Sequence, residues 1–124
     1  MHTSRILVVD DDPSILKFVW ANLEARGYKV LLAVDGEAAL RIAEKGKPDL
    51  IILDIVMPGI DGFAVCRKIR EWSSVPILML SAREGENDKE TCTACGATDY
   101  LTKPFVLKEL LSLVKTILKQ KIVQ

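Results

Sequence analysis

Short apolar runs alternate along the chain with longer segments whose apolar residues recur at helical spacing. Runs without internal polar alternation are typical of strands buried in a parallel sheet, and the helical segments between them are typical crossovers. The pattern predicts five strands and five helices. The strands are expected at 5–10, 28–34, 49–54, 75–81 and 98–102, and the helices at 13–26, 36–45, 62–72, 86–95 and 107–121.

Several helix boundaries carry recognisable signals. Asp12 followed by Pro13 reads as an N-cap and a first helical residue, and Gly27 ends the same helix. The helix over 86–95 has a thin apolar stripe, and Val106 occupies a position where a capping Ser, Asp or Asn is expected. The residues expected to face the sheet are Ile15, Val19, Leu23 and partly Leu16, then Phe63, Cys66 and Ile69, and finally Leu107, Leu110, Leu111, Val114 and Leu118.

Strand–helix alternation with short connections predicts an α/β fold of three layers with right-handed crossovers. The run 49–54 is the most apolar and is therefore expected at the centre of the sheet, whereas 28–34 is mixed and is expected at an edge. The chain contains no internal repeat, low-complexity segment or linker. Residues 1–124 are accordingly predicted to form a single domain.

Polar residues follow four of the predicted strands directly. Asp10 ends the first strand and Asp11 and Asp12 follow it, Asp54 ends the third, Ser81 ends the fourth and Lys103 follows the fifth. Ligands of parallel α/β sheets bind beyond the carboxyl ends of the strands, so these residues are expected to meet at one edge. Several carboxylates, a hydroxyl and an ammonium suit a divalent cation and a phosphoryl group.

Composition further limits the kinds of protein that this chain could be. The chain has 17 Lys and Arg against 17 Asp and Glu, so its net charge gives no indication of nucleic-acid or membrane binding. It contains no apolar run of membrane-spanning length and no signal-peptide core, and its three cysteines argue against a secreted disulfide scaffold. We expect a soluble cytoplasmic domain.

The chain resembles the receiver domain of two-component response regulators over essentially its whole length, and is most similar to receivers of the winged-helix DNA-binding subclass. The resemblance implies a flavodoxin-like, doubly wound parallel sheet of five strands in the order 2-1-3-4-5. The segments that carry it are Ile6–Pro13, Pro48–Asp54 with Met57–Gly62, Ser81–Ala82 and Gly96–Phe105.

The resemblance implies a metal-dependent phosphoacceptor site. Asp54 would be the phosphoacceptor, and Asp10, Asp11, Asp54 and the backbone carbonyl of Val56 would hold Mg²⁺ or Mn²⁺. Asp11 would be the more direct ligand of the acidic pair, with Asp12 mainly a cap. The purely structural alternatives are a solvated acidic loop for Asp10 and Asp11, and a strand-end aspartate that caps a turn for Asp54. Without a cation, the carboxylates of Asp10, Asp11 and Asp54 are expected to repel one another.

Phosphate recognition and switching are implied by the same resemblance. Ser81 and Lys103 would contact the phosphoryl group and Ala82 would leave room for it, with the Lys103–Pro104 bond cis. Tyr100 would be the rotameric partner of Ser81, so that phosphorylation changes the surface of the fourth helix, fifth strand and fifth helix. The alternatives are an ordinary polar strand end, a surface lysine and a packed tyrosine.

Some positions depart from or vary within the family pattern. Val56 and Arg83 occupy positions that tune the lifetime of the phosphoryl group. Leu113 stands where related receivers have an arginine in a dimer-stabilising salt bridge, although Asp99 matches an acidic partner position. The resemblance therefore allows a homodimer through the fourth helix, fifth strand and fifth helix with part of that network missing.

The sequence thus indicates a signalling switch rather than a turnover enzyme. A sensor histidine kinase would phosphorylate this switch. The switch would act on an output domain or effector and would not contact nucleic acid itself. Two alternatives remain: a phosphohydrolase that forms an aspartyl phosphate, which would need a second aspartate where Val56 stands, and an inactive receiver-like interaction module. Cys92 and Cys95 are interpreted as packing residues, because two sulfurs and the terminal His2 do not make a four-ligand zinc site.

Overall fold

A computed structural model describes residues 3–82 and 86–123. It has the predicted sheet, with all strands parallel and in the order β2-β1-β3-β4-β5. The strands are β1 (Arg5–Val9), β2 (Lys29–Ala33), β3 (Leu50–Asp54), β4 (Ile77–Ser81) and β5 (Asp99–Thr102), and the helices are α1 (Pro13–Glu24), α2 (Gly36–Gly46), α3 (Gly62–Arg70), α4 (Glu86–Ala94) and α5 (Leu107–Val123). The predictions of a central third strand and an edge second strand are confirmed.

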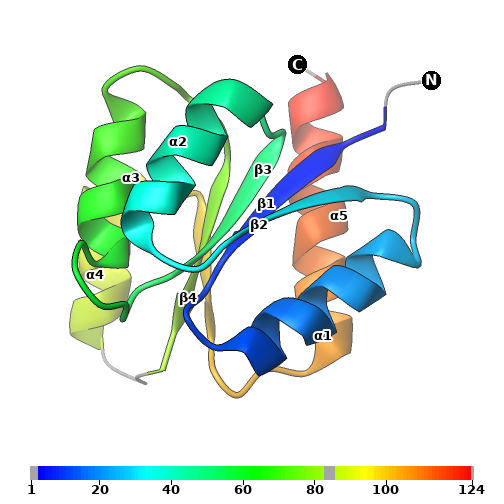
Figure 1. The fold of residues 1–124 in the computed structure, drawn as a ribbon, viewed down its shortest axis with the longest axis horizontal. Helices are drawn as coiled ribbons and strands as arrows, with labels where there is room; N and C mark the ends of the chain where they lie inside the picture. Colours follow the sequence, from blue (N-terminus) through cyan, green and yellow to red (C-terminus); the bar gives the residue numbers. More distant parts are fainter. Residues whose placement is uncertain (1–2, 83–85, 124) are drawn as a thin grey trace.

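Helices cover both faces of the sheet, which makes three layers (Figure 1). The helices α1 and α5 pack on one face, and α2, α3 and α4 pack on the other. Each face has its own apolar core, built from alternate residues of the same strands because successive strand side chains point to opposite faces. In β3 every residue is buried, as a strand covered on both sides requires.

The helix starts follow the predicted capping chemistry. The Asp12 carboxylate accepts a hydrogen bond from the Ser14 N–H at 2.9 Å, and Pro13 is the first residue of α1. At α5, the side chain of Val106 is 61% exposed and only its backbone carbonyl accepts hydrogen bonds from the first turn. The position before α5 therefore lacks a side-chain acceptor, as expected.

Some predicted details were wrong. The third helix ends at Arg70 and not at Trp72, because the N–H groups of Glu71 and Trp72 donate to carbonyls three residues earlier and no longer to those four residues earlier. In α3, Val65 is fully buried although the helical stripe had been assigned to Phe63, which is only half-buried. In α5, Ile117 is buried while Leu107 and Leu111 are half-buried. In α3 the neighbouring helix α2 widens the buried stripe, because Val65 packs beside Gly36.

Two further features bear on the expected functions. Leu113 is half-buried and packs against the core between the sheet and α1 and α5. Among the described residues, no helix combines the length and apolar character needed to cross a membrane. Arg83 and His2 lie outside the described residues.

Candidate functional site

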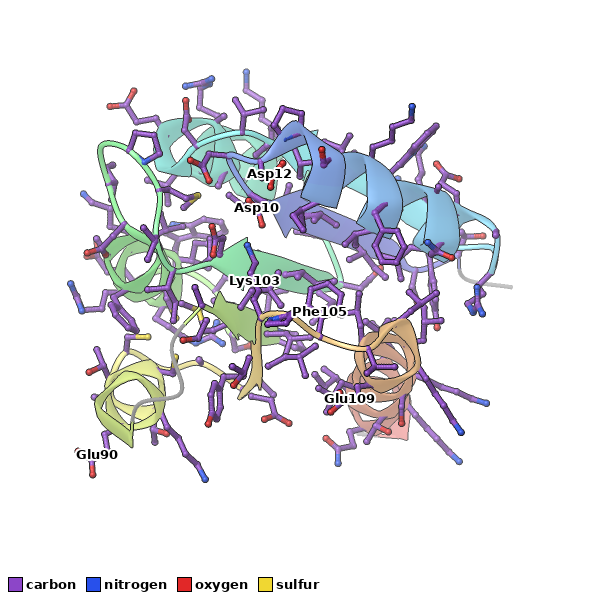
Figure 2. The ribbon with its side chains drawn as sticks, turned by 90° about the horizontal axis from the view of Figure 1, so that it is seen from below. Asp10, Asp12, Glu90, Lys103, Phe105 and Glu109 are labelled. Atoms are coloured by element: carbon purple, nitrogen blue, oxygen red, sulfur yellow. The ribbon has the colours of Figure 1, made fainter. Side chains whose placement is uncertain are left out.

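The carboxyl ends of β1, β3, β4 and β5 line up at one edge of the sheet. The register pairs Val9 with Leu53 and Ser81 with Thr102, so the residues at the ends of these strands are neighbours. Asp10 follows β1, Asp54 ends β3, and Lys103 follows β5. The view onto this edge shows Lys103 pointing towards Asp10 near the centre of the molecule (Figure 2).

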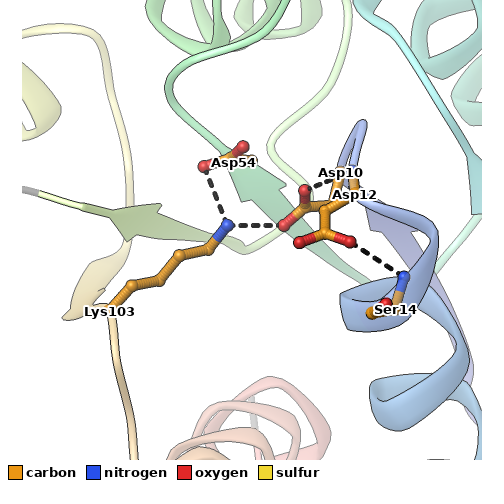
Figure 3. A network of polar contacts seen from close by, with 5 residues as sticks. All are labelled: Asp10, Asp12, Ser14, Asp54 and Lys103. Atoms are coloured by element: carbon orange, nitrogen blue, oxygen red, sulfur yellow. Dashed lines mark hydrogen bonds and ion pairs between the residues drawn. The ribbon is translucent and has the colours of Figure 1, made fainter.

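Lys103 bridges two carboxylates. Its Nζ lies 2.7 Å from Oδ2 of Asp10 and 3.4 Å from Oδ1 of Asp54 (Figure 3). The other oxygen of Asp10 accepts the Asp12 N–H at 2.9 Å, so both carboxylate oxygens have partners. Asp10 is completely buried, and a buried carboxylate is very costly unless it is paired and hydrogen-bonded. Lys103 therefore offsets part of the repulsion expected among these aspartates.

The environment of the site shifts the pKa values of both Asp54 and Lys103. Burial, reinforced by the charge of Asp10, raises the pKa of Asp54 from 3.8 to about 6, and Lys103 only partly opposes this rise. Burial alone would lower the pKa of Lys103, but its hydrogen bond to Asp10 and the charges of Asp54 and Asp10 raise it overall. At neutral pH the site therefore holds an anionic Asp54 beside a fully charged ammonium, which leaves Asp54 able to act as a nucleophile.

The acidic residues form a cluster that could hold a metal ion. Asp10, Asp11 and Asp54 each offer a carboxylate oxygen within 4.8 Å of the others, and Asp11 is exposed to solvent. A set of hard oxygen donors open on one side suits a small divalent cation that keeps some of its water. Asp12 is occupied as the cap of α1 and stands apart from this cluster. Val56 lies in the loop after β3 with its side chain 56% exposed.

Ser81, Ala82 and Tyr100 lie along the neighbouring strands. Ser81 is completely buried at the end of β4, and its carbonyl accepts the N–H of Lys103. Ala82, the next residue, is exposed. Tyr100 pairs with Met79 and is half-buried, so it lies on the same side of the sheet as Ser81, two residue pairs further from the carboxyl ends of the strands. Tyr100 packs against the apolar core that also contains Cys92 of α4.

Gly62 is a positioning residue that sequence reasoning treated only as part of a turn. A Cβ at this position would lie 2.3 Å from the carbonyl oxygen of Asp54 and 2.7 Å from the Cα of Ile55. Its N–H donates to the carbonyl of Ile55 at 2.8 Å, which holds the start of α3 against the end of β3. The glycine-rich turn indicated a bend, but nothing in it indicated that the bend packs against the backbone of Asp54.

The segment after β5 forms one wall of a hollow beside the site. The Lys103–Pro104 bond is cis, as expected, and Phe105 follows it half-buried. The opposite wall comes from α1, where the side chain of Phe18 is 46% exposed. The lining residues are Ile15, Phe18, Ala82, Lys103, Pro104 and Phe105. The hollow thus combines apolar surface with the ammonium that contacts Asp54.

A parallel sheet in this strand order, with aspartates after its first and third strands and a lysine after its fifth, defines a class of signalling proteins. The sequence profile of the response regulator receiver domain matches residues 6–115. The chain belongs to the response regulator receiver domain family, a family of two-component signalling.

Known proteins of several kinds are similar to the chain. It is 49% identical over 117 residues, 94% of its length, to the alkaline phosphatase synthesis transcriptional regulatory protein PhoP of Bacillus subtilis, of which it covers 49%. It is 40% identical over 116 residues, again 94%, to the heme response regulator HssR of Staphylococcus aureus, of which it covers 52%. The structure of the chemotaxis protein CheY4 of Vibrio cholerae has 36% sequence identity and a TM-score of 0.89, covering 94% of this chain and 99% of that one. The chain thus spans about half the length of the two curated relatives.

Proposed function

We propose that Asp54 accepts a phosphoryl group from the phosphohistidine of a sensor histidine kinase, in a reaction that depends on Mg²⁺ or Mn²⁺. The observation that carries this proposal is the contact of a buried, anionic Asp54 with the Lys103 ammonium at 3.4 Å, beside an acidic cluster. Asp10, Asp11, Asp54 and the carbonyl of Val56 would hold the metal, which when bound neutralises charge on the phosphoryl oxygens.

The residues of the site each have a part in the transfer. A carboxylate oxygen of Asp54 forms the new bond to phosphorus while the bond from phosphorus to the histidine nitrogen of the donor breaks. Lys103, already bridging two carboxylates, turns its ammonium towards the incoming phosphoryl oxygens as a point charge. The hydroxyl of Ser81 donates to the same group, and the small side chain of Ala82 leaves space for it. Positioning and charge neutralisation are most of what phosphoryl transfer requires.

The output would arise on the surface of α4, β5 and α5. As Ser81 moves towards the phosphoryl group, the half-buried ring of Tyr100 turns into the vacated space and α4 adjusts with it. This is a two-state element biased by a local electrostatic event. The position of Tyr100 on the same side of the sheet as Ser81, against the core under α4, supports this coupling.

The hollow next to Lys103 is the surface where the kinase would dock. It is the apolar surface adjoining the candidate site, and its exposed member Phe18 lies on α1. A protein donor must bring its phosphohistidine to Asp54, so it must cover the edge that this hollow flanks. A small donor such as acetyl phosphate needs no such contact, which makes the two donors a test of docking.

We further propose that residues 1–124 act as one receiver unit in the cytoplasm. The relatives include a transcriptional regulatory protein and a chemotaxis protein, so the output could be an attached winged-helix domain or a separate effector. The receiver would act through contacts on α4, β5 and α5, including a homodimer, and would not touch nucleic acid directly. In either case the chain would be a switch, with self-phosphorylation and autodephosphorylation as its chemistry.

The two alternatives differ from this proposal in measurable ways. A phosphohydrolase needs a general acid near the nucleophile, and the exposed apolar side chain of Val56 cannot serve. An inactive receiver-like module would not need Lys103 held against Asp54.

The test is treatment with acetyl phosphate and Mg²⁺, followed by intact mass measurement. One acid-stable, hydroxylamine-labile phosphate should appear, should require the metal and should be absent from Asp54→Asn. Asp99→Asn, which changes an exposed carboxylate on β5, is the matched control and should label normally. Full labelling of Asp54→Asn would refute the assignment, and rapid multiple turnover of a phosphate ester would favour the hydrolase.

A further inference from the structure

All three cysteines of the chain lie on the side of the sheet covered by α3 and α4. Cys66 comes from α3, Cys92 from α4, and Cys95 directly follows α4. They are 0%, 3% and 5% exposed and belong to one apolar cluster. All are thiols. The candidate phosphoryl chemistry uses none of them, and the sequence alone gave no reason to group Cys66 with the other two.

Cys66 and Cys95 are in direct contact. The thiol of Cys66 donates to the carbonyl oxygen of Cys95 at 3.2 Å, across 29 positions of sequence. The thiol of Cys95 donates to the carbonyl of Cys92 at 3.1 Å, within its own turn. Burial raises the pKa of Cys66 to about 12, and the neighbouring Cys95 thiol is the next largest cause of that rise. The Cys66 thiol therefore lies against the backbone of Cys95, within the same apolar cluster as the Cys95 side chain.

A second contact joins the same two segments of the chain. Nε of Arg70, on α3, donates to the carbonyl oxygen of Gly96 at 2.9 Å. Gly96 has a φ of +95°, and a Cβ there would lie 3.0–3.2 Å from the Arg70 side chain. The backbone immediately after Cys95 is thus held against α3 by a hydrogen bond and by a close approach that only glycine permits without strain.

Few buried side chains hold α4 against the rest of the fold. Among the described side chains of 89–95, only Cys92 and Cys95 are buried, while Lys89, Glu90, Thr93 and Ala94 are exposed. A helix with so few apolar contacts opens locally at low free-energy cost. Such opening would bring the thiol of Cys95 to solvent while the rest of the fold stays intact.

We propose that Cys66 and Cys95 are an oxidation site, at which hydrogen peroxide forms a disulfide that joins the end of α4 to α3. The sulfur of Cys95, deprotonated during opening, attacks one oxygen of the peroxide. An S–O bond forms, the O–O bond breaks, and hydroxide leaves as water. Cys66 then attacks the sulfenic sulfur, its proton goes to the departing hydroxide, and an S–S bond replaces the S–O bond. Two thiols are oxidised and one hydrogen peroxide is reduced to two waters.

The consequence for signalling rests on the proposed function. If α4 belongs to the surface that phosphorylation changes, a covalent link at its end should restrict that change while leaving the phosphoacceptor edge untouched. The oxidised receiver would accept phosphate at Asp54 but would no longer alter α4.

The experiment treats the full chain with hydrogen peroxide, alkylates remaining thiols and maps disulfides by mass spectrometry after trypsin digestion. We expect a Cys66–Cys95 crosslink with the loss of two hydrogen atoms, and a melting temperature raised by roughly 5 °C or more that dithiothreitol reverses. Cys92 and Cys95 share the tryptic peptide that begins at Glu90, so variants are needed to tell them apart. Cys92→Ser should keep the crosslink, whereas Cys95→Ser should abolish it.

Oxidation is then compared with phosphorylation. Oxidised and reduced protein should both take up phosphate from acetyl phosphate, and only the reduced form should show slower hydrogen exchange in α4 as a result. Absence of any intramolecular disulfide, or a bond that persists in Cys95→Ser, would overturn the oxidation site whatever happens at Asp54. A disulfide in a chain that never becomes phosphorylated would uphold the oxidation site while refuting the proposed function.

Discussion

Replacing Asp54 by Asn should stabilise the metal-free protein at neutral pH, although it removes the proposed phosphoacceptor. Burial and the charge of Asp10 raise the pKa of Asp54 from 3.8 to about 6, so the folded state binds this proton more tightly than the unfolded state does. The folded state is therefore favoured most below pH 3.8, where Asp54 is protonated in both states. Stability from this group is lost as the pH rises through 6.

The size of the effect follows from the difference between the two pKa values. About 1.4 kcal/mol per pH unit over this interval gives roughly 3 kcal/mol as an upper limit for the destabilisation by the ionised carboxylate. Asparagine has nearly the same shape and no charge, but it gives up the contact with Lys103, so we expect a gain of about 1–3 kcal/mol at pH 7.5. Near pH 4 the two proteins should differ little.

Urea unfolding of the wild type and Asp54→Asn in EDTA, at several pH values from 4 to 7.5, measures this difference. Asp99→Asn, the same change at an exposed carboxylate on β5, is again the control. Saturating Mg²⁺ should reverse the order, because a ligand that binds only the folded wild type adds stability by linkage. A difference that stays constant with pH, or a less stable Asp54→Asn at pH 7.5, would refute the account of this carboxylate.

Other substitutions test neighbouring parts of the structure. Lys103→Ala should cost about 3–5 kcal/mol in urea unfolding, because it leaves the buried Asp10 carboxylate without its ion pair, and a cost below 1 kcal/mol would contradict that role. Gly62→Ala should lower stability by more than about 2 kcal/mol and slow phosphorylation, since its Cβ would overlap the last backbone carbonyl of β3; wild-type behaviour would contradict that close approach. Amide hydrogen exchange in α4 should be fast in the unmodified protein and slower after phosphorylation, and strong protection in both states would argue against the switch. Phe18→Asp should reduce phosphate transfer from a cognate kinase at least tenfold but leave labelling by acetyl phosphate unchanged, whereas an equal effect on both donors would exclude a docking role.

The fold could be predicted from the sequence because each strand and helix has its own local signal, and the same kinds of signal recur along the chain. Each buried parallel strand is a short apolar run, each crossover is an amphipathic helix, and the capping pair Asp12–Pro13 marks one helix start without reference to any distant residue. The central position of β3 could also be predicted, since only a strand covered on both faces is apolar throughout. Because parallel strands end at a common edge, the convergence of Asp10, Asp54 and Lys103 followed from the same pattern.

Helix boundaries and core membership were less predictable. The burial of Val65 depends on α2, where a Cβ at Gly36 would lie 2.8 Å from the Val65 side chain. Helical periodicity shows which residues share a stripe, but the width of the buried stripe depends on which helices lie alongside. Periodicity also did not predict that Ile117 is buried in α5 while Leu107 is only half-buried.

Only the tertiary structure decided which polar and sulfur atoms contact one another. The sequence indicated that Lys103 would meet the aspartates, but not that its ammonium would lie closer to Asp10 than to Asp54, a choice that changes the charge balance of the site. It likewise could not pair Cys66 with Cys95, which lie on different helices and are 29 positions apart. Local patterns are set by the backbone period of each element, whereas these contacts depend on how separate elements pack, and that is settled only when the whole chain is folded.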